Sequence, residues 1–171
     1  PTRQPVDEPV AGKRQSAPSP QISTLMTEVL EPENLNRALA QVKRNKGAPG
    51  IDGMTVDELG AHLKANWPTI RAQLVEGSYC PKPVRRVEIP KPDGRRRLLG
   101  IPTVVDRFIQ QGIAQVVRRR WEPHFHPNSY GFRPGRNAHQ AMRHAQATIR
   151  QGYGWVVDID LEKFFDHVNH D

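Results

Sequence analysis

The spacing of apolar residues predicts two short helices near the start of the chain. Within residues 23–30, and again within residues 35–42, apolar side chains recur three and four positions apart, which places them on one face of a helix. Residues 46–53 follow with three glycines and a proline, a composition that favours a tight irregular loop. From residue 23 up to this loop, the chain is therefore expected to be helical.

Signals typical of helix starts predict two further helices. Thr55 and Glu58 have the spacing of a capping box, so a helix is expected to begin there and to bury Leu59. Asn66 is a plausible cap and Pro68 suits a first helical turn, so a second helix is expected to begin near Pro68.

The pattern then changes to that of a β-hairpin followed by two more helices. Residues 84–89 and 95–101 have the pattern of strands joined by a Pro-Asp-Gly turn. Residues 103–121 are amphipathic at helical spacing, and residues 137–150 predict another helix, which Asn137 caps. The residues of this last helix that we expect to be buried are Ala138, Ala141, Met142 and Ala145.

The remaining segments complete the expected fold. Residues 154–160 predict a strand that is buried on at least one face, and residues 1–22, rich in proline, predict a disordered leader. All 11 aromatic residues lie at or after Trp67, so the large side chains of the core are expected in the last 105 positions. The fold class is therefore α/β (α+β), with helices packed on a small antiparallel sheet.

Composition and charge narrow the possible functions. The one cysteine among 171 residues excludes an internal disulfide and fits a reducing intracellular compartment, and no apolar run approaches the roughly 20 residues that span a bilayer. The net charge is +7, but residues 79–150 carry 15 basic against 4 acidic side chains, and residues 151–171 carry 1 against 5. A segment this basic favours nucleic acid as a partner over a merely solvated surface. The sequence begins at Pro1 and ends within a patterned segment, so it is expected to be part of a longer protein.

Two aspartates in the predicted C-terminal strand are candidates for binding a metal ion. Side chains alternate along a strand, so Asp158 and Asp160 are expected on the same face. Carboxylates on one face repel each other unless solvent or a divalent cation lies between them, and hard oxygen ligands suit Mg²⁺. Two-metal sites of this kind serve phosphoryl transfer. The alternative is a pair of polar residues that bond to helix amides, and the spacing alone does not decide.

Two basic segments are candidates for binding phosphate. Lys91 and Arg97 flank the hairpin turn and can close on a triphosphate, although charges also protect exposed hairpins from aggregation. Residues 129–137 place Tyr130, Phe132 and two arginines directly before a helix N-terminus, which suits a phosphate, while aromatic rings stack on bases. The alternative is that the aromatic residues belong to the core and the arginines to the solvated surface.

Together, these segments resemble the reverse transcriptases encoded by group II introns. In that family a fingers hairpin of the type I-P-K-P-D-G-x-x-R-x-L-G-I-P precedes a Y-G-F-R-P-G-R loop and a palm strand that ends in D-[IL]-x-x-[FC]-F-D. Here the matching residues are 89–102, 130–136 and 160–166. Residues 46–53 resemble the N-terminal extension motif of the same family, so the resemblance spans about residues 25–171.

The resemblance implies a role for each matching residue. Asp160 matches the aspartate that binds both catalytic Mg²⁺ ions, with the carbonyl of Leu161 as a second ligand. Phe165 matches the aromatic residue under the sugar of the incoming nucleotide, and Lys91 and Arg97 match the residues that hold its triphosphate.

Further residues and partners follow from the same resemblance. Asp158 has no firm catalytic counterpart and is expected to support Asp160. Template or scaffold contacts are expected from Arg133 and Arg136. The basic charge of the middle segment adds the arginines at 118–120, so the residues expected to bind nucleic acid are Arg118, Arg119, Arg120, Arg133 and Arg136. The implied partners are group II intron RNA, an RNA template, a DNA primer and deoxynucleoside triphosphates (dNTPs), with no membrane.

The resemblance also implies a domain plan. Residues 23–78 match a helical extension of the fingers, residues 79–150 the basic fingers, and residues 151–171 the start of a palm. The Y-x-D-D motif that completes the family's metal site does not occur in this sequence, so the 171 residues are expected to be inactive alone. The alternatives are a non-catalytic, maturase-like RNA-binding module, or a related diversity-generating, retron or CRISPR-associated reverse transcriptase.

Overall fold

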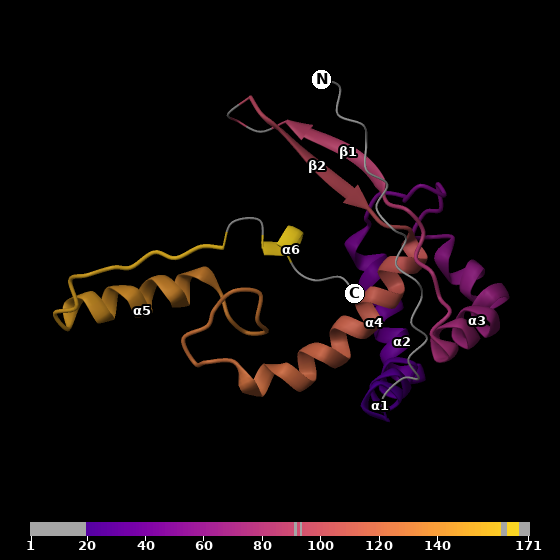
Figure 1. Ribbon diagram of the computed structural model, residues 1–171, viewed down its shortest axis with the longest axis horizontal. Helices are drawn as coiled ribbons and strands as arrows, with labels where there is room; N and C mark the ends of the chain where they lie inside the picture. The colour runs from indigo at the N-terminus through magenta and orange to yellow at the C-terminus, as the bar shows by residue number, and fades with distance from the viewer. Residues whose placement is uncertain (1–19, 91, 93, 162–163, 168–171) are drawn as a thin grey trace, which may run out of the picture. The chain divides into compact units, whose positions relative to one another are not determined.

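A computed structural model describes residues 20–90, 92, 94–161 and 164–167 (Figure 1). Its elements are helices and a two-stranded antiparallel sheet, which confirms the expected mixed class. The chain divides into two compact units, with the boundary between Trp121 and Glu122, whereas the domain plan placed its boundaries after residues 22, 78 and 150. The predicted leader lies almost wholly outside the described residues.

Four helices form the body of the first unit: α1 (Pro20–Val29), α2 (Pro32–Asn45), α3 (Leu59–Glu76) and α4 (Val104–Trp121). Both α1 and α2 pack against α4, and α1 also contacts α2 and α3. The two helices predicted near the start of the chain and the helix predicted for residues 103–121 are confirmed. None of the described helices combines the length and hydrophobicity that crossing a bilayer requires.

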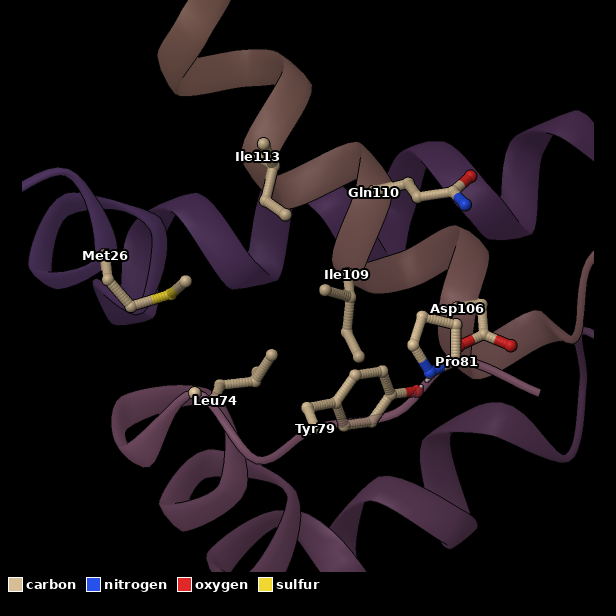
Figure 2. Close-up of a pocket in the computed structure, with 9 residues that line it drawn as sticks. Met26, Leu74, Tyr79, Pro81, Asp106, Ile109, Gln110 and Ile113 are labelled. Atoms are coloured by element: carbon tan, nitrogen blue, oxygen red, sulfur yellow. Dashed lines mark hydrogen bonds between the residues drawn. The ribbon is translucent and has the colours of Figure 1, made fainter. Parts of the chain in front are cut away.

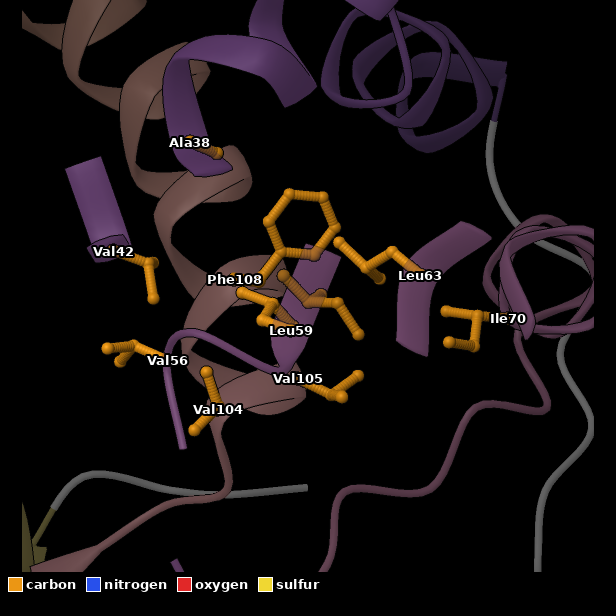
Figure 3. Packing of buried hydrophobic residues seen from close by; sticks show 10 residues of the cluster. Ala38, Val42, Val56, Leu59, Leu63, Ile70, Val104, Val105 and Phe108 are labelled. Atoms are coloured by element: carbon orange, nitrogen blue, oxygen red, sulfur yellow. The ribbon is translucent and has the colours of Figure 1, made fainter. Parts of the chain in front are cut away.

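The core of this unit is mainly aliphatic and is built by α2, α3, α4 and the loop before α3 (Figure 3). Leu59 and Val104 are fully buried, and Phe108 meets the edge of the Trp67 ring with 5.9 Å between ring centroids. In the described part of the chain, Phe108 is the one aromatic residue that is buried. The expectation that the later aromatic residues also form core is wrong, since Trp155 is 97% exposed.

A buried asparagine joins three helices of the body. The Asn34 side chain donates to the carbonyls of Val29 and Gly112 at 2.9 and 3.0 Å, and its Oδ1 accepts from Nε2 of Gln115 at 2.8 Å. Asn34 is only 1% exposed, and a polar group buried this deeply is costly unless it is bonded. These hydrogen bonds therefore fix the end of α1 and the middle of α4 against α2.

Two glycines allow the loop of residues 46–53 to lie against α4. A Cβ at Gly50 would come within 2.6 Å of the Thr103 Cα, and a Cβ at Gly47 within 2.0 Å of the Arg107 guanidinium. The same guanidinium donates to the carbonyl of Ala48 at 2.8 Å. The predicted irregular loop is confirmed, and the missing side chains explain how it approaches the helix so closely.

The helix predicted to begin near Pro68 does not exist as a separate element. Instead α3 continues through Pro68, although proline removes one helical hydrogen bond. Residues on either side explain this, because Leu63 and Ile70 are both buried and Trp67 packs on the core. Asn66, the expected cap, donates its side chain to the carbonyl of His62 within the same helix, at 3.0 Å.

The predicted hairpin is confirmed as β1 (Arg85–Pro90) and β2 (Arg96–Ile101), which pair antiparallel with Pro90 opposite Arg96. Gly94 in the connection has a φ of +80°, a conformation that glycine adopts readily. All but one residue of each strand is exposed. In Figure 1 the hairpin accordingly projects away from the helices of its unit.

The second unit contains the short 3₁₀ helix η1 (Glu122–His124), α5 (Ala138–Arg150) and α6 (Phe164–His167). Asn137 caps α5 as predicted. Its side chain accepts from the N–H of Gln140 at 3.0 Å, and the Gln140 side chain accepts from the N–H of Asn137 at 2.9 Å. Local sequence therefore determined where this helix begins.

The face of α5 that was expected to be buried is not covered. No residue of α5 is buried, and Met142 is 71% exposed. Ala138 and Ala145 are exposed as well, and Ala141 is half-buried. An amphipathic pattern shows which face suits burial, but burial needs an element that packs there, and none of the described residues of this unit does.

The strand predicted for residues 154–160 is not formed. The segment has no regular secondary structure, and Trp155, Val157 and Ile159 are all more than 80% exposed. A strand takes its backbone hydrogen bonds from a neighbouring strand, and the described residues offer this segment none. The prediction of a buried strand is therefore wrong for the chain as it stands here.

Candidate nucleic-acid interface

The hairpin presents cationic side chains to solvent. Arg97 lies on β2 opposite Ile89 and is exposed. Its neighbour Arg96 forms an ion pair with Glu88 across the two strands, and such exposed pairs add little stability. Lys91, the second residue expected to hold a triphosphate, lies outside the described residues. The structure thus places Arg97 on an exposed β-hairpin, whereas Lys91 is not among the residues that it describes.

A buried carboxylate lies at the base of this hairpin. Asp106 is 3% exposed and accepts from the hydroxyl of Tyr79 at 2.7 Å, the backbone N–H of Lys82 at 3.3 Å and the hydroxyl of Thr103 at 2.5 Å. Its own N–H donates to Thr103 Oγ1 at 3.1 Å, so the two residues cap the start of α4 reciprocally. Burial, and then the hydrogen bond to Asp106, raise the pKa of Tyr79 well above its usual value.

A cavity of about 260 Å³ lies beside Asp106 and is lined mostly by apolar side chains (Figure 2). Figure 2 shows Met26, Leu74 and Ile109 around it, with the Tyr79 hydroxyl turned toward the carboxylate. Because these two polar groups bond to each other, the cavity is a feature of packing and not a candidate reaction site.

The arginines at the end of α4 are engaged within the first unit. Arg119 and Arg120 both donate to the carboxylate of Glu28 on α1, Arg119 at 3.1 Å. The hydrogen bond from Arg120 is the main cause that holds the Glu28 pKa below its usual value, and Arg119 adds to it. Of the three arginines at this end of α4, two therefore pair with an acceptor inside the chain, while Arg118 is exposed.

Arg133 organises the loop before α5. Its guanidinium donates twice to Oε1 of Glu122, at 3.0 and 2.8 Å, and once each to the carbonyls of His126 and Ser129, at 2.8 and 2.9 Å. It also lies 5.1 Å from the centroid of the Phe125 ring, and its side chain is only 8% exposed. Of the template and scaffold roles expected for Arg133, this geometry matches the scaffold role.

Arg136 occupies a more accessible position in the same loop. Its guanidinium lies 5.5 Å from the centroid of the Tyr130 ring, and the Tyr130 hydroxyl is 3.0 Å from Nδ1 of His144 on α5. The other aromatic residue of the motif, Phe132, is fully exposed with a φ of +56°. The loop thus offers an exposed ring and a half-buried cation beside the capped start of α5, a combination suited to stacking and phosphate binding.

The acidic segment expected to bind metal is exposed. Oδ1 of Asp160 accepts from the N–H of Leu161 at 2.9 Å, and Asp158 is exposed as well. Phe165 belongs to α6, but its side chain is outside the described part. Among the described residues, no three His, Cys, Asp or Glu side chains are grouped to hold a metal ion. Carboxylate and carbonyl oxygens are the kinds of ligand that suit Mg²⁺, and Asp160 and Leu161 carry both.

Sequence reasoning missed the network around Asp106. One signal was present, because Thr103 and Asp106 have the spacing of a capping box, as Thr55 and Glu58 do. The bonds from Tyr79 and Lys82 join residues more than 20 positions apart, and no local pattern reports such contacts.

Comparisons with known proteins show which proteins this chain is similar to. Residues 89–171 match the family described as reverse transcriptase (RNA-dependent DNA polymerase). The protein YkfC of Escherichia coli is 39% identical over 159 residues, which cover 90% of this chain and 42% of YkfC.

Two further relatives are named for introns. The group II intron-encoded protein LtrA of Lactococcus lactis is 34% identical over 146 residues, 83% of this chain and 24% of LtrA. Nuclear intron maturase 1 of Arabidopsis thaliana is 33% identical over 70 residues, 41% of this chain and 10% of the maturase. The chain thus spans less than half the length of each of these relatives. Residues 89–171 therefore match the reverse transcriptase family, and the chain is similar to group II intron-encoded proteins and intron maturases over part of their length.

Proposed function

We propose that this chain supplies the fingers and the first palm segment of an intracellular RNA-directed DNA polymerase of the group II intron type. Its partners are an RNA template, a DNA primer, dNTPs and the intron RNA, which the same protein binds in splicing and mobility. The observation that carries the proposal is the order of hairpin, arginine loop and acidic segment within the region that matches reverse transcriptases. Relatives named as intron-encoded proteins and maturases support the intron part.

In this proposal the hairpin binds the triphosphate of the incoming nucleotide. The exposed guanidinium of Arg97 and the ammonium group of Lys91 pair with phosphate oxygens, and hydrogen bonds between charged partners are the strong ones. The hairpin suits this role because its strands present most of their side chains to solvent.

The acidic segment contributes to metal binding and nucleotide placement. Asp160 supplies a carboxylate and Leu161 a backbone carbonyl to bind Mg²⁺, and Phe165 is the residue assigned to the sugar of the incoming nucleotide. When bound, Mg²⁺ activates the attacking primer hydroxyl and stabilises the leaving oxygens of the triphosphate. A complete two-ion site needs further carboxylates, and the unpaired backbone of residues 154–160 offers an edge where a strand that carries them can pair.

The polymerase activity can be tested by primer extension. The full-length protein is expected to extend a DNA primer on an RNA template when Mg²⁺ and dNTPs are present, and EDTA should abolish the product. The 171-residue chain alone is expected to give none, because it supplies only part of the metal site. Extension in excess EDTA, or efficient extension by the 171 residues alone, would contradict the proposal.

A non-catalytic RNA-binding module is the second candidate, favoured by the net charge of +11 over residues 79–150. Both candidates predict that RNA binding depends on the end of α4. Replacing Arg118, Arg119 and Arg120 with alanine should weaken RNA binding and make it less sensitive to salt. On single-stranded RNA, the binding constant falls as salt is raised. The magnitude of the slope of log K against log salt should decrease by about 0.7 for each phosphate that these arginines no longer neutralise. Fluorescence anisotropy over a salt series measures both quantities.

A glutamine at Glu28 separates direct RNA contact from a structural role of these arginines. Glu28→Gln removes the carboxylate that competes with RNA for Arg119 and Arg120, so affinity at low salt should rise about threefold. Glu33→Gln is the matched control, because Glu33 pairs with Arg37 on the exposed side of α2 and its replacement removes the same charge. Equal gains from both variants would mean that only net charge matters, and that the end of α4 makes no specific contact.

A further inference from the structure

In the part of the chain that the structure describes, most of the hairpin stands clear of the helical body. Nearly all side chains of β1 and β2 are exposed, and the helices that pack on one another leave the two strands to pair between themselves. The angle at which the hairpin projects therefore depends on the segments that enter and leave it. These are residues 77–84, between α3 and β1, and residues 102–103, between β2 and α4.

One carboxylate bonds to both of these segments. Oδ1 of Asp106 accepts from the Tyr79 hydroxyl at 2.7 Å, and Oδ2 accepts from the Lys82 N–H at 3.3 Å, so the carboxylate holds the segment that enters the hairpin. Oδ2 also accepts from the Thr103 hydroxyl at 2.5 Å, two residues after β2 ends. Asp106 itself belongs to the first turn of α4, which is part of the core.

Two neighbouring contacts strengthen the same junction. The Lys82 ammonium group lies 3.5 Å from Oδ2 of Asp52, in the loop before α3, and Gly50 of that loop packs directly on Thr103. The carboxylate of Asp106 is almost completely buried, where a hydrogen bond to a charged acceptor is stronger than one at the surface. The base of the hairpin is thus held by three segments that meet around one buried charge.

We propose that Asp106 is a positioning residue, whose carboxylate fixes the angle of the hairpin and with it the placement of Arg97 on the triphosphate. The second half of this inference rests on the proposed function, since it assumes that the hairpin binds a nucleotide. The first half concerns the hairpin alone and holds for any ligand. Capping of α4 by Thr103 and Asp106 does not account for the bonds from Tyr79 and Lys82, which lie outside that helix.

Two conservative substitutions each remove one hydrogen bond to Asp106. One bond lies on the segment that enters the hairpin, and the other lies on the segment that leaves it. Tyr79→Phe keeps the ring in its cavity and deletes the hydroxyl, and Thr103→Val keeps the shape and deletes the donor. Each is expected to speed amide hydrogen exchange in residues 85–89 and 96–101 of the full chain by about tenfold, because a bond to a buried charge is removed. Thr103→Ser retains the hydroxyl, so exchange in the hairpin of this variant should stay as slow as in the unchanged protein.

Matched controls are available elsewhere in the chain. Thr55→Val removes a hydroxyl that donates to the exposed carboxylate of Glu58 at 2.7 Å, and Tyr130→Phe removes one that bonds to His144 in the second unit. Neither control should change exchange in the hairpin. If Tyr79→Phe and Thr103→Val speed exchange in α4 but leave the hairpin unchanged, Asp106 is only a helix cap and the inference fails.

Steady-state kinetics of the full-length polymerase test the second half. The same two variants should raise KM for dNTPs about five-fold and change kcat less than twofold, because the hairpin binds the triphosphate but performs no bond making. Faster hairpin exchange with an unchanged KM would overturn the link to nucleotide placement. A wild-type protein without polymerase activity would instead refute the proposed function, while the exchange data would still decide whether Asp106 anchors the hairpin.

Discussion

Replacing Asp160 with alanine in the full-length protein is expected to slow DNA synthesis by about a thousandfold or more. A carboxylate that binds a catalytic metal supports several kcal/mol of transition-state stabilisation, and each 1.4 kcal/mol corresponds to a factor of ten in rate. The affinity for RNA should not fall, because Asp160 is an exposed anion in a segment with net negative charge. Single-turnover primer extension and fluorescence anisotropy measure the two quantities separately.

Asp158→Ala is the matched control for this substitution. Asp158 is exposed in the same segment and carries the same charge, but it has no assigned catalytic counterpart. Its replacement is expected to slow synthesis by less than about tenfold, as fits a supporting residue. If Asp160→Ala left synthesis unchanged, or if both variants were equally impaired, the metal-binding role assigned to Asp160 would be wrong.

Replacing Asn34 with leucine is expected to destabilise the first unit by about 3–5 kcal/mol. Leucine has nearly the same size but cannot donate, so the carbonyls of Val29 and Gly112 lose their side-chain donor, and Gln115 keeps only the backbone carbonyl of residue 34 as an acceptor there. Each buried polar group left without a partner costs about 1–3 kcal/mol. Urea unfolding followed by circular dichroism measures the change, which is large compared with the total stability of a typical domain.

Asn66→Leu provides the comparison for this second result. Asn66 also donates to a carbonyl, that of His62, but it is exposed on α3, where water can take over the hydrogen bond. The free energy of unfolding of the Asn66→Leu protein should differ from that of the unchanged protein by less than about 0.5 kcal/mol. A similar small effect at both positions would show that the buried network contributes little.

Features with local causes were predictable from the sequence. The hairpin follows from the Pro-Asp-Gly turn between two short strands, and the start of α5 follows from Asn137 and its capping box with Gln140. The order of basic and acidic motifs also lies in the sequence itself, which is why the resemblance to reverse transcriptases could be stated from it. Residues 89–171 match that family.

Features that depend on distant contacts were not predictable. Pro68 is a helix breaker by local rules, yet α3 continues because its neighbours Leu63 and Ile70 are anchored in the core. The pattern of α5 and of residues 154–160 shows which faces suit burial, but it does not supply the element that buries them. Their exposure in the structure follows from that missing cover.

The candidate interface shows the same division. The excess of basic residues predicted that Arg119 and Arg120 bind nucleic acid, and the family resemblance implied a template or scaffold contact for Arg133. Neither argument reveals acceptors inside the chain. Glu28 accepts hydrogen bonds from Arg119 and Arg120, and Glu122 and two loop carbonyls accept hydrogen bonds from Arg133. The predicted roles of Asp160, Arg97 and Lys91 rest on motif matches, and the experiments above test them.

The hairpin is a lever arm, and its length amplifies any movement at the base. Six residues per strand correspond to roughly 20 Å. A tilt of about 10° where the strands leave the helices therefore moves the tip by about 3 Å, which is about the length of a hydrogen bond to a phosphate oxygen. A change too small to notice among the helices is therefore enough to shift the guanidinium of Arg97, near the far end of the hairpin, by about the length of a hydrogen bond.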